Sequence, residues 1–188
     1  IFTSDNGSNG RNGGSNRPLS GAKGSTMEGG MRVPLIARWP GRIPSNSTCR
    51  ELGTMMDLLP TFCALTGASV PSQKLDGFDI SEMLFGQGDA KSQYAALYYY
   101  RRRQLQAIRY GDWKYHLPLQ ATHPNWTSAK HAGPGRSGKL VNLKSDLQEK
   151  TDVTAANPEV VKRMQELLKT AVMTLGNDDT PGSEQRDS

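Results

Sequence analysis

The chain has 188 residues, of which 35% are hydrophobic and 22% are charged, and it carries a net charge of +5. No apolar run approaches the roughly 20 residues that a membrane-spanning helix needs, so we expect no membrane span. The basic residues are scattered, and their one run is Arg101-Arg102-Arg103. We interpret this run as a charged hairpin tip and expect no nucleic-acid partner, because no similar basic and aromatic pattern repeats nearby.

Asp5 and Asn6 lie where a short apolar run ends. Residues 1–3 are β-prone, and residues 4–24 are rich in Gly, Ser and Asn, which is typical of a surface loop. Open α/β sheets bind ligands in loops at the carboxyl ends of their strands. The sequence therefore predicts Asp5 and Asn6 at the exit of a strand. Because residue 1 is not Met and already lies in the apolar run, we expect a piece of a longer protein.

The next segments predict a strand and a helix. Residues 31–39 are β-prone, although Pro34 favours an edge or irregular position. Residues 52–65 repeat apolar side chains three and four positions apart, which predicts an amphipathic helix that is kinked or divided near Pro60. Turn signals fill residues 67–91, so we expect a domain boundary directly after them.

The second half of the chain predicts an antiparallel sheet. Residues 94–100, 105–110 and 113–117 have the composition of three strands, and residues 140–143 could add a fourth. Gly111-Asp112 is the signal of a type II′ hairpin between the second and third strands. We therefore expect consecutive strands to pair with one another.

A long loop and a terminal helix complete the predicted elements. Residues 120–139 have little periodicity and should form the loop. Asn157 as the N-cap, Pro158 at the first helical position and Gly176 as the stop frame an amphipathic helix. The tail after residue 177 is polar, and we expect it to be disordered.

Several short motifs, in a fixed order, resemble the second half of a type I sulfatase. They are Ser4-Asp5-Asn6-Gly7, Lys23-Gly24, residues 28–34, Trp39-Pro40-Gly41, residues 75–80, residues 107–114 and residues 142–146. Each motif alone is common, but their order and spacing together are specific. The resemblance covers residues 1 to about 175, and the arylsulfatase A branch is the nearest type.

This resemblance implies the α/β fold class. Residues 1–92 would form the C-terminal part of an alkaline-phosphatase-like sulfatase α/β sheet domain. Residues 93–188 would form a small C-terminal antiparallel sheet packed with a terminal helix and followed by a disordered tail.

The resemblance also implies that Asp5 and Asn6 ligate calcium. The chemistry of the pair agrees, because Ca²⁺ is a hard ion that takes about 6–8 oxygen ligands from carboxylates and amide carbonyls. A related superfamily of phosphatases and phosphonate hydrolases tends to place His at the second position, which suits a transition metal. Without the downstream motifs, an Asx-turn that closes the strand would be the simpler interpretation.

Lys23 resembles the family lysine that contacts the substrate sulfate as a catalytic and binding group. Its ammonium would oppose negative charge on the sulfate oxygens as the ester bond breaks, whereas an isolated loop lysine is more often simply solvated. His116 is a candidate for the substrate-binding pocket, with an ordinary strand histidine as the alternative. We interpret Glu28 and Arg32 as structural support for the loop and the strand entry.

The family nucleophile does not match either cysteine. Type I sulfatases use a formylglycine made from Cys in Cys-x-Pro/Ala-x-Arg, whereas Cys49 is followed by Arg-Glu-Leu-Gly and Cys63 by Ala-Leu-Thr-Gly. The formylglycine and the family's pair of N-terminal aspartates would precede residue 1. We therefore expect the isolated chain to be inactive. Whether the two cysteines form a disulfide is left open.

The sequence thus predicts a fragment of a sulfuric ester hydrolase that uses Ca²⁺ and formylglycine. The alternatives are a phosphoryl or phosphonate hydrolase of the same superfamily and a non-catalytic pseudoenzyme or binding protein. The expected partner is a sulfated small molecule or a sulfated glycan. Relatives imply a periplasmic, secreted or lysosomal location, while the particular sulfate ester and the oligomeric state stay open.

Overall fold

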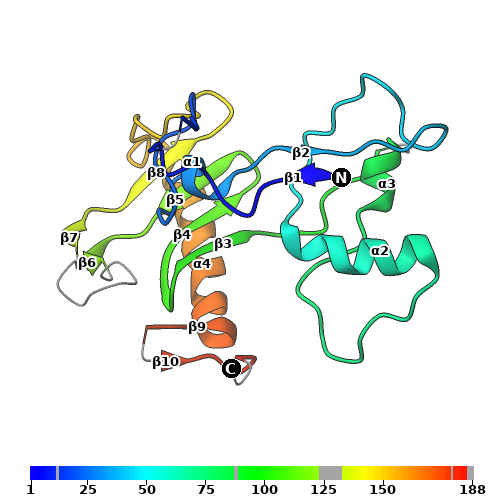
Figure 1. Ribbon diagram of the computed structural model, residues 1–188. Helices are drawn as coiled ribbons and strands as arrows, with labels where there is room; N and C mark the ends of the chain where they lie inside the picture. Colours follow the sequence, from blue (N-terminus) through cyan, green and yellow to red (C-terminus); the bar gives the residue numbers. More distant parts are fainter. Residues whose placement is uncertain (12, 87–88, 123–132, 179, 186–188) are drawn as a thin grey trace. The chain divides into compact units, whose positions relative to one another are not determined.

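The computed structural model describes residues 1–11, 13–86, 89–122, 133–178 and 180–185 (Figure 1). The chain divides into two compact units, one made of residues 1–5 and 34–95 and the other of residues 6–33 and 96–188. Residues 6–33 thus group with the C-terminal half of the chain, and the expected boundary after residue 92 stays a prediction. Within the described residues, no helix is both long and apolar enough to cross a bilayer.

The first unit contains one small antiparallel strand pair. Strand β1 (Phe2–Thr3) pairs with β2 (Leu35–Ile36), with Phe2 opposite Ile36. The predicted strand over residues 31–39 is thus reduced to two residues. Pro34 directly precedes them and cannot donate a hydrogen bond to a sheet ladder, which explains the late start.

Three helical segments complete the first unit: the 3₁₀ helix η1 (Met55–Asp57), α2 (Leu58–Thr66) and α3 (Ser81–Phe85). The predicted helix over residues 52–65 starts later because Thr54 is its N-cap and forms a capping box with Asp57. Pro60 lies in the first turn of α2, where the missing N–H has no helical partner to lose, so it does not divide the helix.

Asp57 is fully buried and organises this unit. Its Oδ1 accepts hydrogen bonds from the backbone N–H of Phe78 at 2.8 Å and from the hydroxyl of Tyr94 at 2.5 Å. Its Oδ2 accepts from the backbone N–H of Thr54 at 2.6 Å. One carboxylate therefore joins the helix start to two later segments of the chain.

A four-stranded antiparallel sheet forms the centre of the second unit. Its order is β3 (Leu97–Arg101), β4 (Gln104–Tyr110), β5 (Trp113–His116) and β8 (Lys139–Asn142). All four predicted strands are confirmed. Gly111, between β4 and β5, has a φ of +56° and Asp112 has no positive φ, which is the pattern of the expected type II′ turn.

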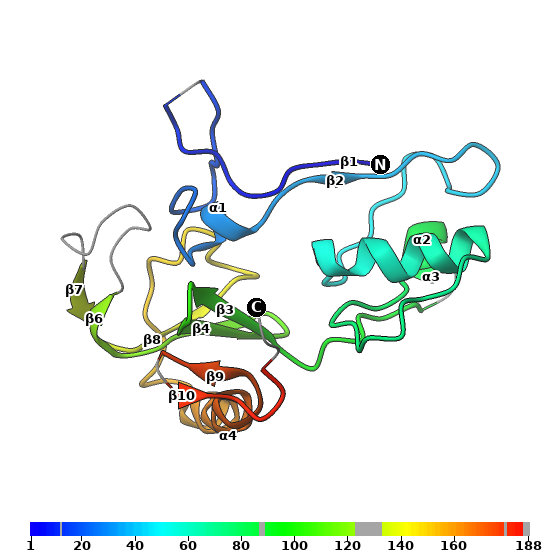
Figure 2. The same ribbon diagram turned by 60° about the horizontal axis from the view of Figure 1, so that its bottom comes forward.

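Helix α4 (Pro158–Leu175) covers one face of this sheet (Figure 2). Its bounds match the prediction, but Asn157 makes no capping bond, and its side chain instead donates to the carbonyl of Val153 at 2.9 Å. The core between the helix and the sheet is apolar and buried: Leu105, Ile108, Tyr115, Leu140, Met164, Leu168 and Ala171.

Two small strand pairs lie where irregular structure was expected. Strand β6 (Leu119–Thr122) pairs with β7 (Gly133–Arg136) inside the predicted loop over residues 120–139. Strand β9 (Gly176–Asn177), directly after α4, pairs with β10 (Thr180–Pro181), which lies in the predicted disordered tail. The prediction of irregular structure was wrong for these strands, because composition does not show backbone pairing in short segments rich in Gly and Pro.

Candidate functional site

The loop that carries Asn6 and Lys23 folds back on the short helix α1 (Glu28–Met31). The backbone N–H of Gly7 donates to the carbonyl of Gly30 at 3.0 Å, and the backbone N–H of Lys23 donates to the carbonyl of Ser8 at 3.1 Å. Two segments that are apart in the sequence, residues 6–8 and residues 22–25, are therefore held together by main-chain hydrogen bonds.

Glycine is required where these segments meet. A Cβ atom added to Gly7 would lie 1.8 Å from the carbonyl oxygen of Gly29, and one added to Gly29 would lie 2.5 Å from that of Ser20. Both neighbours are backbone atoms, which cannot move aside as a side chain could. The Gly-rich composition of the loop thus allows three backbone segments to approach one another closely.

Asp5 and Asn6 follow β1 at the strand exit, as predicted. Asp5 is exposed and groups with the first unit, whereas Asn6 is half-buried, with its Oδ1 buried, and groups with the second. Their carboxylate and amide oxygens are the hard donors that Ca²⁺ prefers, so the pair fits part of a calcium shell. No group of three or more His, Cys, Asp or Glu able to hold a metal ion occurs in the described part of the chain. The pair could therefore supply only some of the ligands.

Lys23 is exposed, and its position is determined by its backbone. Besides the bond to Ser8, the turn that follows is closed by a hydrogen bond from the N–H of Ser25 to the carbonyl of Ala22 at 2.9 Å. The ammonium is thus available to an anionic ligand. Its contact with sulfate stays a prediction.

His116 occupies a different environment from the other candidates. It lies in β5, is only 2% exposed, and its Nε2 is 2.9 Å from Glu149 Oε1. Burial lowers the pKa of His116, although the hydrogen bond to Glu149 partly offsets that effect. The ring is therefore neutral at pH 7 and packed inside the second unit. Its role in substrate binding stays a prediction.

Lys114 and Glu149 form a buried ionic cluster with Glu28 that the sequence analysis did not single out. Lys114 Nζ is 2.9 Å from Glu28 Oε1 and 2.9 Å from Glu149 Oε1, and all three side chains are at most 1% exposed. Arg109 is a second cation, with its guanidinium 3.9 Å from Glu28 Oε2. The cluster therefore balances two carboxylates with two cations.

The environment of Glu149 keeps it ionised. Burial alone would raise its pKa, but the hydrogen bond to His116, the charge of Lys114 and the N–H of Glu28 together lower the pKa to about 2. Tyr99 has the opposite response, because burial and the charge of Glu28 raise its pKa. Glu149 is therefore ionised and Tyr99 neutral at pH 7.

A sequence signal for Lys114 existed in β5. Side chains of a strand alternate between faces, so in Trp113-Lys114-Tyr115-His116 the cation and the imidazole share a face opposite to Tyr115. Tyr115 belongs to the apolar core under α4, which places Lys114 and His116 on the other face. A lysine on a central strand of a covered sheet indicates a buried ion pair.

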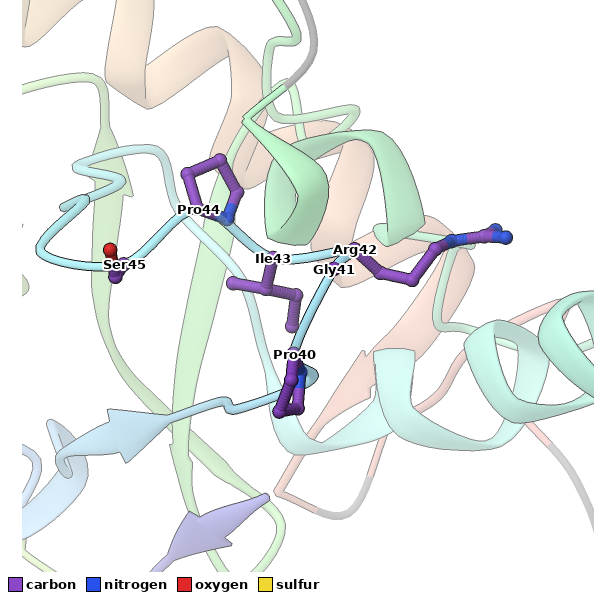
Figure 3. A pocket seen from close by; sticks show the side chains of 6 residues that line it. All are labelled: Pro40, Gly41, Arg42, Ile43, Pro44 and Ser45. Carbon is purple, nitrogen blue, oxygen red and sulfur yellow. The ribbon is translucent and has the colours of Figure 1, made fainter.

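An open hollow in the first unit is lined by residues 40–45 (Figure 3) and contains none of the candidate residues. Arg42, the charged residue among those six, lies over the rings of Trp39 and Phe85, at 5.3 and 5.1 Å from their centroids. The hollow is therefore a product of the turn after β2 and has no link to the predicted chemistry.

Comparisons with known proteins place this geometry in a family. Residues 23–174 match the family model described as N-sulphoglucosamine sulphohydrolase, C-terminal. The chain is 37% identical over 186 residues to arylsulfatase A of Homo sapiens, covering 89% of this chain and 36% of that protein. It is 42% identical over 122 residues to N-acetylgalactosamine-6-sulfatase of Canis lupus familiaris, covering 62% and 23%.

Solved structures agree with the sequence matches. The PsFucS1 sulfatase from Pseudoalteromonas sp. superimposes with a TM-score of 0.69 at 28% identity, covering 90% of this chain and 36% of that one. Ps i-CgsB superimposes with a TM-score of 0.69 at 32% identity, covering 89% and 35%. The chain thus spans about a third of the length of these relatives. The predicted resemblance is confirmed, and the chain belongs to the sulfatase family through its C-terminal domain.

Proposed function

We propose that the full-length protein hydrolyses sulfate esters, with Asp5, Asn6 and Lys23 as this chain's contribution to the active site. The observation that best supports the proposal is the packing of residues 6–8 against the Lys23 loop, fixed by the bond from the N–H of Lys23 to the carbonyl of Ser8. This packing holds the segment that contains Asn6, a predicted metal ligand, beside the loop that contains Lys23, the predicted sulfate contact. Because the chain belongs to the sulfatase family, we interpret these two segments as parts of one sulfate-binding site.

Asp5 would donate a carboxylate oxygen and Asn6 an amide oxygen to Ca²⁺. When bound, the ion supplies positive charge that stabilises negative charge on the sulfate oxygens. Lys23 would contribute a second positive charge from the opposite segment of the loop, donating hydrogen bonds to an oxygen of the sulfate. The ammonium would stabilise the transition state more than the ground state where it faces the departing ester oxygen, because negative charge grows on that oxygen as the S–O bond breaks.

The nucleophile is proposed to be a formylglycine in a part of the protein outside this chain. Cys49 and Cys63 lie in motifs that differ from Cys-x-Pro/Ala-x-Arg, and Cys63 is buried. Without a nucleophile, binding terms alone remain, so the isolated chain is proposed to be inactive.

The substrate is proposed to be a sulfated glycan or another sulfate ester of a small molecule. Ps i-CgsB has been solved in complex with k-i-k-neocarrahexaose, and another relative is named N-acetylgalactosamine-6-sulfatase. The net charge of +5 favours anionic substrates in general. By the same family argument, the full-length protein is proposed to work in the periplasm, outside the cell or in the lysosome.

A direct test compares two substrates and three metal ions on the full-length protein. We expect hydrolysis of p-nitrophenyl sulfate that is lost on chelation and restored by Ca²⁺, with little hydrolysis of p-nitrophenyl phosphate. Hydrolysis of the phosphate that is restored by Zn²⁺ or Mn²⁺ would instead support a phosphoryl hydrolase. Absence of both activities from a folded protein with an intact Cys-x-Pro/Ala-x-Arg motif would support a non-catalytic binding protein.

A further inference from the structure

Residues 26–28, which follow the Lys23 turn, are held by the side chains of Lys114 and Glu149. Lys114 Nζ, from β5, donates to the carbonyl of Thr26 at 2.8 Å and to Glu28 Oε1 at 2.9 Å. Glu149, from the turn after β8, accepts a hydrogen bond from the backbone N–H of Glu28 at 2.7 Å through Oε2. Residues 26–28 are therefore bound through both main chain and side chain.

Two further side chains of the sheet, those of Gln106 and Tyr99, also form hydrogen bonds with this segment. The hydroxyl of Thr26 donates to Gln106 Oε1 at 3.0 Å, and the hydroxyl of Tyr99 donates to Glu28 Oε1 at 3.1 Å. Gln106 can reach Thr26 because it sits at the irregularity in the pairing of β3 with β4, where Tyr99 pairs with Ala107 and the next residue pairs with Leu105. Strands β3, β4 and β5 all contribute to holding one short segment.

Lys114 is the centre of this arrangement. Its ammonium is fully buried, contacts two carboxylates and one carbonyl, and lies 4.1 Å from the centroid of the Tyr99 ring. The oxygens and the ring together replace the water that a lysine normally keeps. Such an arrangement fixes geometry more than it adds net stability, because desolvation of the charges offsets much of their attraction.

We propose that Lys114 is a positioning residue for the reaction: by holding residues 26–28 it sets where the ammonium of Lys23 stands relative to the sulfate. This inference rests on the proposed function of Lys23. Lys114 does not touch the substrate, since it is buried under the loop. It acts through three residues of backbone, from Thr26 back to the turn closed by the Ser25 N–H and the Ala22 carbonyl.

The expected loss follows from how strongly catalysis depends on alignment. A displacement of about 1 Å in a catalytic group can cost on the order of 100-fold in rate. Releasing Thr26 and Glu28 leaves the Lys23 turn held by its bond to Ser8 and by the contacts of the glycines. We therefore expect a fall in kcat for a sulfate ester on the order of 10- to 100-fold, with a smaller change in KM.

The experiment is a double-mutant cycle in the full-length protein with p-nitrophenyl sulfate as substrate. The first pair of variants is Lys23→Met and Lys114→Met, alone and together. If Lys114 acts through Lys23, the Lys114 substitution changes kcat by less than about threefold once Lys23 is Met, because there is no ammonium left to position. If its effects in the two backgrounds multiply, Lys114 acts independently of Lys23 and the inference is overturned.

A second variant removes the risk that Lys114→Met does not fold. Lys114→Met combined with Glu149→Gln removes one cation and one anion, leaving Glu28 beside Arg109, while the amide can still accept from the N–H of Glu28. We expect this double variant to be folded by circular dichroism and still reduced in kcat, because the bond to Thr26 is gone. A folded double variant with the parental kcat would overturn the inference.

The same data separate this inference from the proposed function. Lys162→Met, on the exposed side of α4, is the matched control and should keep the parental kcat. If Lys23→Met also keeps it, the proposed role of Lys23 fails, and the inference fails with it. If Lys23→Met is impaired but the cycle is additive, the proposed function stands and the positioning role of Lys114 alone is rejected.

Discussion

The two faces of the sheet β3-β4-β5-β8 are both buried, but they are covered by different kinds of contact. The face under α4 is apolar, with Leu105, Leu140 and Met164 fully buried. The face under α1 is polar, with Lys114 and His116 buried among carboxylates and hydroxyls. Figure 2 shows the helix α4 and the loop with α1 on opposite sides of the same strands.

This difference separates stability from precise positioning. Apolar contacts have no preferred direction, so the core side chains under α4 could be replaced by other apolar side chains of similar volume with small losses in the free energy of unfolding. Charged hydrogen bonds have strict geometry, and an unmatched partner is costly. The Lys23 loop lies on this polar face. We therefore expect a substitution on the polar face to displace the Lys23 side chain, whereas a substitution under α4 should not.

The largest expected effect contrasts one substitution on each face. Lys114→Met leaves Glu149 buried without its cation, and breaking such a pair typically costs about 3–5 kcal/mol in the free energy of unfolding. Leu140→Met is a volume-conserving change under α4 and should cost less than about 1.5 kcal/mol. Urea unfolding of both variants checks the contrast. Equal losses would show that the polar face contributes no more than ordinary packing.

The next effect is a loss of stability in acid that depends on Glu149. Its folded pKa is about 2 against an ordinary value of 4.5, so its stabilising contribution is complete above pH 4.5 and is lost as the pH falls toward 2. This lowering corresponds to about 3 kcal/mol. Glu149→Gln should therefore flatten the dependence of the melting temperature on pH in that range. Glu159→Gln, on exposed α4, is the control, and an equal flattening there would contradict the assignment.

The smallest expected effect is on the outer surface of α4. Arg163 and Glu166 form an ion pair at 3.4 Å in which both side chains are about half exposed. Such pairs contribute roughly 0.2–0.5 kcal/mol. Arg163→Ala should thus shift the urea midpoint barely at all, and the shift should vanish in 0.5 M salt. A loss above about 1 kcal/mol would mean that charge matters on this face as well.

The apolar face could be predicted from the sequence, whereas on the polar face the sequence carried a signal for Lys114 but not for its partners. The β-prone composition of residues 105–117 and the apolar period of residues 158–175 identified the strands and α4. Glu28 and Glu149 are 121 residues apart, and nothing local indicates that they share a cation. The bulge that turns Gln106 toward Thr26 depends on strand register, which composition does not determine.

The candidate site was predicted from a resemblance more than from physics. Asp5 and Asn6 at the end of β1 are also compatible with a simple turn, and the order of the downstream motifs alone favoured a metal. The environment of Glu28 confirms the interpretation of that residue as structural support. For His116, its burial against Glu149 could not be foreseen, because the partner comes from the turn after β8.

The most direct test of the central claim is the kcat of the full-length protein on an aryl sulfate, measured for the parent, Lys23→Met and the control Lys162→Met. We predict that Lys23→Met lowers kcat by about 100- to 1000-fold, while the control and the fold by circular dichroism are unchanged. A Lys23→Met protein that is folded and hydrolyses the ester at the parental rate would contradict the assignment of this loop to the active site.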